Sequence, residues 1–118
     1  MSRPFSTAER AVLQELAKAG PPQLAAQLDV AQYDGPAFEG SQSFGIVVPD
    51  SAPRIDLADG IIETTERQVR HGDEPTGGVM LWLKEGRVCA YEYYWHTDEM
   101  PDCQPRPDQI VDLQLELV

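Results

Sequence analysis

The chain has 118 residues and a formal net charge of −11, with 42% hydrophobic and 25% charged residues. This length supports one hydrophobic core, so we predict a single domain over residues 1–118, and the balanced composition excludes an intrinsically disordered chain. No run of about 20 apolar residues occurs, which argues against a membrane-spanning helix, and the acidic charge disfavours nucleic acid and anionic membranes as partners.

The first regular element is predicted by a helix-capping pattern near the N-terminus. Ser6-Thr7-Ala8-Glu9 fits a capping box, in which the serine hydroxyl and the glutamate carboxylate each bind a free backbone N–H. Apolar residues recur near helical spacing until Gly20-Pro21-Pro22, so we expect a helix of about three turns that covers one face of a sheet. A short second helix can follow over residues 23–28, where Pro22 suits the first turn.

The middle of the chain contains short strand patterns separated by turns and loops. We expect a weak strand over residues 29–33, a turn at Asp34-Gly35-Pro36, a strand ending in Phe44–Val48, and a loop over residues 49–60. Residues 61–70 fit either a strand or a short helix, and their β-branched side chains favour a strand. Residues 71–78 are expected to form a turn that leads into the next element.

The clearest pattern in the sequence predicts a β-hairpin over residues 78–95. Two runs rich in β-branched and aromatic residues flank Glu85-Gly86, and the glycine can adopt the positive φ that a two-residue turn requires. A turn at this point pairs Lys84 with Arg87, and uninterrupted pairing continues along both strands. Both faces of the resulting hairpin are apolar, so we expect its strands to be central and covered on both sides.

The predicted register assigns every side chain of the hairpin to one of its faces. One face is predicted to carry Val79, Leu81, Leu83, Val88, Ala90, Glu92 and Tyr94. The other is predicted to carry Met80, Trp82, Cys89, Tyr91, Tyr93 and Trp95. We therefore expect Trp82, Tyr93 and Trp95 to share a face.

Three prolines between His96 and Pro107 predict an irregular segment after the hairpin. The final run, Ile110–Val118, alternates between apolar and polar residues, which is typical of a strand with one wet face near a sheet edge. Together these elements predict an α+β fold, in which an N-terminal helix packs on a mostly antiparallel sheet of about five strands.

The common catalytic and metal-binding patterns are absent from the sequence. It has no phosphate-binding glycine loop, no Cys-x-x-Cys, no His-Glu-x-x-His and no Gly-x-Ser-x-Gly, so we predict no catalytic residue, metal or cofactor. Glu92 and His96, with Asp98, Glu99 and Cys103 nearby, remain an alternative, because a carboxylate beside an imidazole can act as an acid/base pair or as half of a metal site.

The N-terminus predicts the cellular compartment, and the compartment in turn predicts the state of the two cysteines. Met1–Ser6 lacks the apolar core of a signal peptide, which predicts a cytoplasmic location. Cys89 and Cys103 are therefore predicted to be free thiols, because disulfides are rare in that compartment.

Aromatic and acidic residues between Trp82 and Asp102 are the candidate partner-binding site. An aromatic patch next to an acidic loop is typical of a surface that binds a basic protein, although such aromatics also suit a core. A platform for nucleic-acid bases would need basic residues beside the aromatics, and acidic residues stand there instead. The predicted site consists of Trp82, Tyr93, Trp95, Asp98, Glu99 and Asp102.

Part of the chain resembles a bacterial protein family. The matching residues are Gly78-Val79-Met80-Leu81-Trp82-Leu83, Glu85-Gly86 and Glu92–Pro101, which fit the pattern G-x-L-L-W-L-x-x-G-x-L-x-x-L-E-x-Y-W-Y-x-D-E-x-P. This pattern resembles a set of small uncharacterised proteins found mainly in actinobacteria and other high-GC bacteria. Many of them carry Cys-Gly-Cys where this chain has Phe38-Glu39-Gly40-Ser41, so a thiol or metal role of that motif does not carry over.

The resemblance implies no activity, but a small acidic single domain is similar in type to the immunity proteins of bacterial polymorphic toxin systems. We therefore expect a non-enzymatic binding protein that neutralises a cognate toxin, with its acids paired to basic residues of the toxin. Two alternatives remain: a small enzyme or ligand-binding domain that uses Glu92 and His96, and a homodimeric scaffold in which a second copy covers one face of the sheet.

Overall fold

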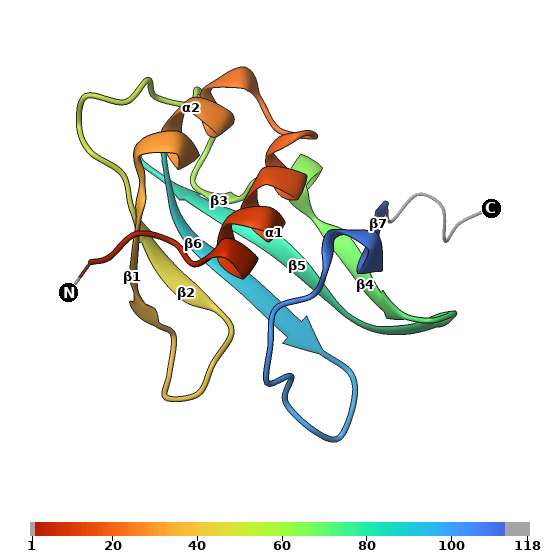
Figure 1. Cartoon of the computed structure of the whole chain (residues 1–118). Helices are drawn as coiled ribbons and strands as arrows, with labels where there is room; N and C mark the ends of the chain where they lie inside the picture. The colour runs from red at the N-terminus through yellow and green to blue at the C-terminus, as the bar shows by residue number, and fades with distance from the viewer. Residues whose placement is uncertain (1, 113–118) are drawn as a thin grey trace.

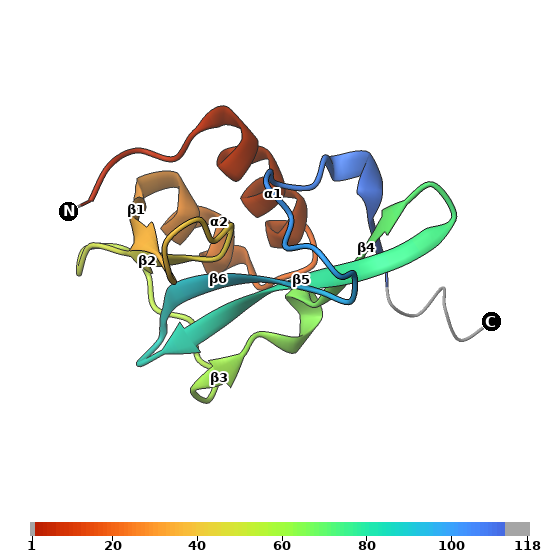
Figure 2. The ribbon, with the colours of Figure 1, turned by 90° about the horizontal axis from the view of Figure 1, so that it is seen from below.

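Two helices pack on one face of an antiparallel β-sheet in the computed structural model, which describes residues 2–112 (Figure 1). The helices are α1 (Thr7–Ala17) and α2 (Pro22–Val30). Figure 2 shows both helices on one side of the sheet, and the short strand β3 (Gly60–Ile61) pairs with one end of the long strand β5. The predicted α+β fold, with an N-terminal helix packed on the sheet, is confirmed.

The sheet contains seven strands within the described residues, where the sequence predicts about five. Besides β3 they are β1 (Gln32–Pro36), β2 (Phe44–Val47), β4 (Arg67–His71), β5 (Glu74–Lys84), β6 (Arg87–Trp95) and β7 (Ile110–Asp112). Their order across the sheet is β1-β2-β6-β5-β4-β7, and β3 pairs with β5 outside this path. The two long strands β5 and β6 therefore lie at the centre, as predicted for the hairpin.

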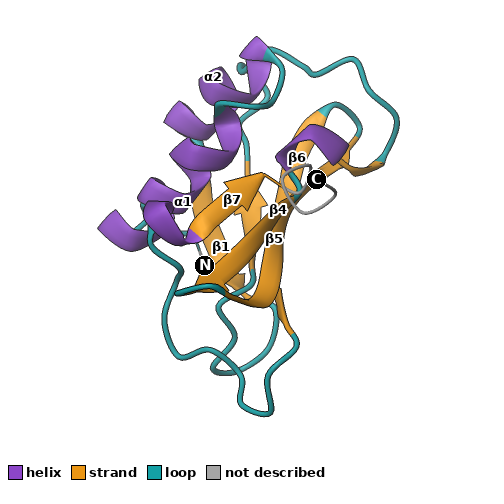
Figure 3. Cartoon of the chain, turned by 90° about the vertical axis from the view of Figure 1, so that its right-hand side faces the viewer, coloured by secondary structure: helices purple, strands orange, loops and turns teal. Residues whose placement is uncertain are grey.

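The hydrophobic core lies between the helices and the sheet, and Figure 3 shows the helices as one layer beside the strands. Every other residue of the central strands points into this layer, as the period of a β-strand requires. The largest fully buried apolar side chains are Leu13, Leu16, Leu24, Ile62, Leu81 and Tyr91.

The capping box predicted at the start of α1 is present and extended. Ser6 Oγ accepts a hydrogen bond from the Glu9 backbone N–H at 3.2 Å, and Glu9 Oε1 accepts one from the Ser6 N–H at 2.8 Å. The Arg3 guanidinium donates to both Glu9 oxygens, at 2.9 and 3.0 Å, and its Cζ lies 3.7 Å from the centroid of the Tyr33 ring. One carboxylate therefore joins the first turn of α1 to the edge strand β1.

The β5–β6 hairpin turns at Glu85-Gly86 as predicted, but its register shifts just beyond the turn. Trp82 pairs with Ala90, where an uninterrupted ladder predicts Cys89. The extra residue on β6 is a β-bulge, and it reverses the face that each later side chain takes. The predicted pairs from Trp82 back to Val79 are therefore wrong by one residue of β6.

The bulge directs two tyrosines of β6 into the core. Tyr91 and Tyr93 are 1% and 4% exposed, on the face that the helices cover. Trp82, Glu92 and Tyr94 lie on the opposite face, which neither α1 nor α2 covers (Figure 2). We call this side of the sheet the open face.

Several predicted elements in the middle of the chain differ from the structure. The segment predicted as a turn at residues 34–36 belongs to β1, where Gly35 has a φ of 96° and the register is irregular. Residues 61–70 contain parts of β3 and β4, separated by the 3-10 helix η1 (Glu63–Thr65). The predicted turn at residues 71–78 is reduced to Gly72-Asp73, because β5 already begins at Glu74.

The ends of two other predicted elements also changed. The second helix runs to Val30, so β1 begins at Gln32 instead of residue 29. The 3-10 helix η2 (Pro107–Gln109) ends the proline-rich segment and leads into β7. The strand predicted over residues 110–118 is present as far as Asp112, and residues 113–118 lie outside the described part of the chain.

A buried amide connects α2 to the end of the central hairpin. Gln27 is 0% exposed, and its Nε2 donates to the carbonyl oxygens of Pro53 and Gly86 at 2.7 and 2.8 Å. Its Oε1 accepts a hydrogen bond from the Val88 N–H at 2.9 Å. β2 pairs with β6 at Tyr91 and Ala90, and the Gly86 carbonyl and the Val88 N–H lie beyond these pairs, nearer the turn. Gln27 bonds both groups as a neighbouring strand would.

The first prediction concerns this amide. Gln27→Leu keeps a side chain of similar size but leaves buried backbone groups without partners, and each such group costs about 1–3 kcal/mol. We expect the free energy of unfolding to fall by about 2–4 kcal/mol in urea titrations. Gln14→Leu, on the exposed side of α1, is the matched control and should change stability by less than about 0.5 kcal/mol. Equal effects of the two substitutions would contradict the role of Gln27.

A second prediction follows from Glu9. Burial raises the pKa of this carboxyl, but hydrogen bonds from Arg3 and Ser6 outweigh burial, so its pKa in the folded protein lies below the ordinary glutamate value. Its contribution to stability is therefore complete above the ordinary pKa and is lost as the pH falls through the folded pKa. We expect the stability difference between wild type and Glu9→Gln to be largest at pH 7 and to shrink between about pH 5 and pH 3.

Urea unfolding at a series of pH values measures this difference. Glu15→Gln is the control, because Glu15 pairs at 2.8 Å with a Lys18 side chain that is 71% exposed. Such exposed pairs contribute about 0.5 kcal/mol or less. A difference for Glu9→Gln that stays constant down to pH 3 would show that the Arg3–Glu9 pair does not stabilise the fold through its charge.

Candidate partner-binding surface

The structure separates the six predicted site residues into four places. Trp82 is half-buried on the open face, whereas Tyr93 is 4% exposed in the core. Trp95 is half-buried at the end of β6, opposite Gly77. The three acids, Asp98, Glu99 and Asp102, are all exposed in the loop that follows β6.

The prediction that Trp82, Tyr93 and Trp95 share a face is wrong. Trp82 of β5 lies on the open face, and the bulge at Cys89 turns Tyr93, like Tyr91, to the opposite, helix-covered side of the sheet. A side chain as buried as Tyr93 offers a partner almost no contact area. The aromatic part of the predicted site is therefore divided, and its acidic part has other neighbours.

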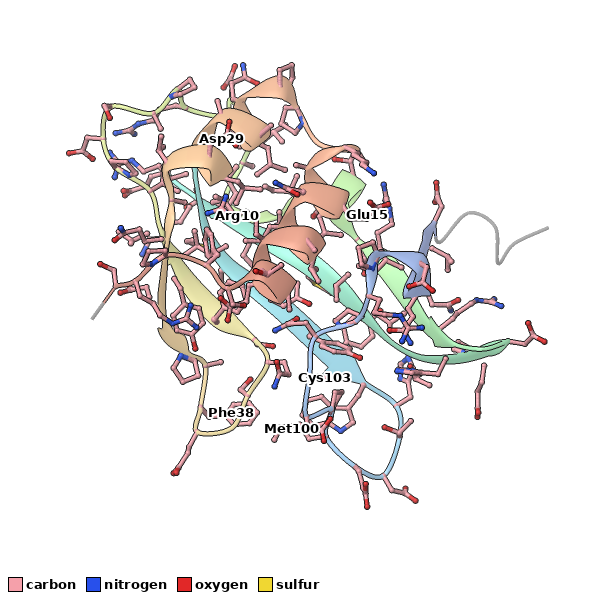
Figure 4. The ribbon with its side chains drawn as sticks, in the orientation of Figure 1. Arg10, Glu15, Asp29, Phe38, Met100 and Cys103 are labelled. Carbon is pink, nitrogen blue, oxygen red and sulfur yellow. The ribbon has the colours of Figure 1, made fainter. Side chains whose placement is uncertain are left out.

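The acidic loop lies against the connection between β1 and β2. The Met100 methyl lies 3.6 Å from the point where a Cβ on Gly40 would stand. Phe38 belongs to the same tight turn as Gly40, since its carbonyl accepts the Ser41 N–H at 2.9 Å. Figure 4 shows Phe38 and Met100 at the same end of the molecule, on these two loops.

Hydrogen bonds hold the two loops together. Gln104 Nε2 donates to the main-chain and side-chain oxygens of Gln42, at 2.7 and 3.1 Å. The hydroxyl of buried Tyr91 donates to Gln104 Oε1 at 2.8 Å, and the Tyr93 N–H donates to Ser43 Oγ at 2.8 Å. Burial raises the pKa of Tyr91 well above its ordinary value, so its hydroxyl remains a neutral donor. Both loops are thus anchored to the central strand β6.

These loops present apolar side chains among carboxylates. Phe38 is 51% exposed and Met100 is 37% exposed, and the two side chains stand on adjoining loops. The sequence has no Lys or Arg in residues 34–43 or 96–104. We call this surface the loop platform, and it consists of Phe38, Glu39, Asp98, Glu99, Met100 and Asp102.

The sequence prediction missed the apolar half of the loop platform. Phe38 stands in Gly35-Pro36-Ala37-Phe38-Glu39-Gly40, a segment with no strand or helix pattern, where a large aromatic side chain has no obvious core to join. Its place in the sequence could therefore have indicated an exposed Phe38. No sequence pattern indicates that Met100 approaches this turn, because the two loops are about 60 residues apart and meet only when β2 lies beside β6.

Glu92 and His96, the predicted alternative site, have separate partners. Glu92 Oε1 accepts a hydrogen bond from Trp82 Nε1 at 3.0 Å. His96 is exposed, and its ring meets the Tyr94 ring edge-on with 5.5 Å between the centroids. Among the described residues no hydrogen bond joins Glu92 to His96, and no group of three or more His, Cys, Asp or Glu is placed to hold a metal ion.

A groove between α1 and α2 is a further concave feature. It has a volume of about 200 Å³ and an apolar lining that includes Phe5, Leu13 and Leu28. Arg10 and Asp29, on different helices, also line it (Figure 4). Small-molecule sites usually enclose about 300–1,000 Å³, so this groove suits a single side chain better than a metabolite.

No protein-family model, curated protein or solved structure matches this chain. The resemblance to small proteins of high-GC bacteria therefore stays a prediction based on residues 78–101. Within residues 2–112 no helix is both long enough and apolar enough to cross a bilayer.

Proposed function

We propose that this protein is a binding protein whose loop platform docks on a basic surface of another protein. The observation that carries the proposal is the pair of exposed apolar side chains, Phe38 and Met100, which stand among carboxylates in two stretches, residues 34–43 and 96–104, that contain no Lys or Arg. An apolar centre surrounded by a polar rim is the usual anatomy of a protein interface, and aromatic and methionine side chains are enriched there.

Charge and rigidity both support this role. The net charge of −11 favours rapid encounter with a basic protein and disfavours nucleic acid and anionic membranes. The bonds from Tyr91 and Gln104 hold the loops in place before a partner arrives. A surface that is already ordered loses less conformational entropy on binding, which leaves more of the contact energy for affinity.

The proposed partner is a toxin that the same cell produces, and the protein acts as its immunity protein. In this mechanism Asp98, Glu99 and Asp102 pair with basic residues that the toxin uses to hold an anionic substrate, while Phe38 and Met100 fill an apolar depression beside them. The complex blocks the toxin by covering its substrate-binding surface, and the protein itself performs no chemistry. The toxin and its inhibitor meet in the cytoplasm.

The third prediction tests the carboxylates of the loop platform. A variant with Asp98→Asn, Glu99→Gln and Asp102→Asn should bind the partner purified from the native host at least about tenfold more weakly, because the rim charges are lost. Calorimetry or biosensor titration measures the affinity. The matched control removes the same charge from exposed positions outside both loops through Asp29→Asn, Asp56→Asn and Glu85→Gln.

The control variant should retain most of the affinity and lose only part of the salt-dependent association rate. If the two triple variants bind equally, the overall charge matters and the loop platform is not the docking surface. A partner without a basic surface would contradict the proposal outright.

A fourth prediction concerns the order of the loop platform. Tyr91→Phe removes the hydroxyl that bonds Gln104, so the backbone order parameters of residues 98–104 should fall from about 0.85 to below about 0.7. Tyr94→Phe, on the open face, is the matched control and should leave them unchanged. NMR relaxation measures both variants, and equal order parameters in Tyr91→Phe and wild type would show that this hydrogen bond does not fix the loop.

A further inference from the structure

The open face of the sheet carries a tryptophan, a glutamate and a tyrosine in succession. Glu92 stands opposite Met80 in the β5–β6 ladder, and its carboxylate accepts the Trp82 indole N–H at 3.0 Å. Tyr94 lies two residues further along β6 on the same face, and its ring covers Gly78, where any side chain would collide with it. Both aromatic rings thus flank one carboxylate.

A second carboxylate approaches the same residues from the segment before β4. Glu66 directly precedes Arg67, which pairs with Val79, and Glu66 lines the same hollow as Trp82. Burial raises the pKa of Tyr94, and the negative charges of Glu66 and Glu92 raise it further. No ion pair among the described residues involves Glu66 or Glu92. The two carboxylates therefore stand beside aromatic rings without a basic side chain of the described residues paired to either of them.

The open face is hollowed beside Trp82. The hollow has a volume of about 760 Å³, and its lining includes Leu57 and Ile61, which are 53% and 37% exposed. Glu63 and Glu66 also line the hollow, together with Asp59. Within the described residues its lining contains no Lys or Arg. It combines apolar walls with carboxylates, as the loop platform does on another part of the surface.

The walls of this hollow are held by buried contacts. Ile61 pairs with Trp82 through β3 and β5, which places the two side chains next to each other on the sheet. Thr65 is 0% exposed, and its Oγ1 donates to the Ile62 carbonyl at 2.6 Å and accepts the Leu81 N–H at 3.1 Å. The hollow therefore exists before any ligand binds.

Arginine is the side chain that best fits this chemistry. Its planar guanidinium can donate two parallel hydrogen bonds to a carboxylate and can stack on an aromatic ring at the same time. Glu92 offers the carboxylate, and Trp82 and Tyr94 offer the rings. An apolar residue next to that arginine would reach the hollow, where Leu57 and Ile61 expose apolar area.

We propose that the open face is a second docking surface, which binds a segment of a protein partner that carries an arginine beside a large apolar side chain. The arginine pairs with Glu92 between Trp82 and Tyr94, and the apolar side chain enters the hollow. A second copy of this chain fits less well, because its net charge of −11 opposes association with an acidic face. The site is distinct from the loop platform and does not depend on the proposed immunity role.

A peptide titration followed by NMR tests this proposal without the natural partner. The chain has two tryptophans and therefore two indole N–H signals. The signal that remains in Trp95→Phe belongs to Trp82. The probe is an end-blocked hexapeptide of alternating leucine and arginine. We expect the Trp82 indole signal to shift and to saturate at submillimolar peptide. Peptides with serine in place of leucine should bind at least about fivefold more weakly, and those with lysine in place of arginine about threefold more weakly.

Three variants locate the binding. Glu92→Gln keeps an acceptor for Trp82 but removes the charge, and should weaken binding at least about fivefold. Leu57→Asn changes an exposed loop side chain that the fold does not need, and should weaken binding about threefold. The loop-platform triple variant should bind the peptide like wild type, which separates this site from the proposed function.

Several outcomes would overturn the proposal. One is a Trp82 signal that does not move when the peptide is added, and another is binding of the serine–arginine peptide as tight as that of the leucine–arginine peptide. The others are wild-type affinity in both Glu92→Gln and Leu57→Asn, and loss of peptide binding in the loop-platform variant. A Trp82 shift that follows protein concentration without peptide would show that a second copy of the chain occupies the face, and it would also overturn the proposal.

Discussion

The extra residue at Cys89 controls which aromatic side chains of the central hairpin enter the core and which face outward. It turns Tyr91 and Tyr93 toward the helices, where both are almost fully buried. The same residue leaves Glu92 and Tyr94 on the open face beside Trp82. Since side chains alternate along a strand, one inserted residue exchanges the two faces for the rest of β6. Both candidate surfaces depend on it, because Tyr91 also supports the acidic loop.

Two buried polar side chains take the place of missing strand neighbours around this hairpin. Gln27 bonds the Gly86 carbonyl and the Val88 N–H on one side of it, and Thr65 bonds the Leu81 N–H on the other. Short strands such as β2 and β3 cannot pair with the whole length of β5 and β6, so backbone groups at the ends need other partners. A sheet with long central strands and short outer strands therefore needs side chains that bond the unpaired backbone groups of the central strands.

The surface charge is organised around exposed apolar side chains at two separate places. On the loop platform, Phe38 and Met100 stand among acids of two loops that hydrogen bonds join. On the open face, Trp82 stands beside carboxylates from β6 and from the segment before β4. An apolar contact supplies affinity and surrounding charge supplies selectivity and speed, so either surface suits a basic protein partner. Two such surfaces on one small domain would let a partner be held at two points, with a gain in avidity.

Local patterns in the sequence determined the capping box at Ser6 and Glu9 and the turn at Glu85-Gly86, because both depend on neighbouring residues. They also determined the central place of the hairpin and the α+β class, which depend on the simple periodicity of apolar residues. The sequence also identified the exposed acids Asp98, Glu99 and Asp102. The bulge at Cys89 leaves no mark in the apolar pattern, since both faces of the hairpin are apolar and either register buries hydrophobic side chains. Only the tertiary structure decided that Tyr93 is buried and that Met100 lies against the turn of Phe38, because contacts between distant segments depend on how the strands are ordered in the sheet.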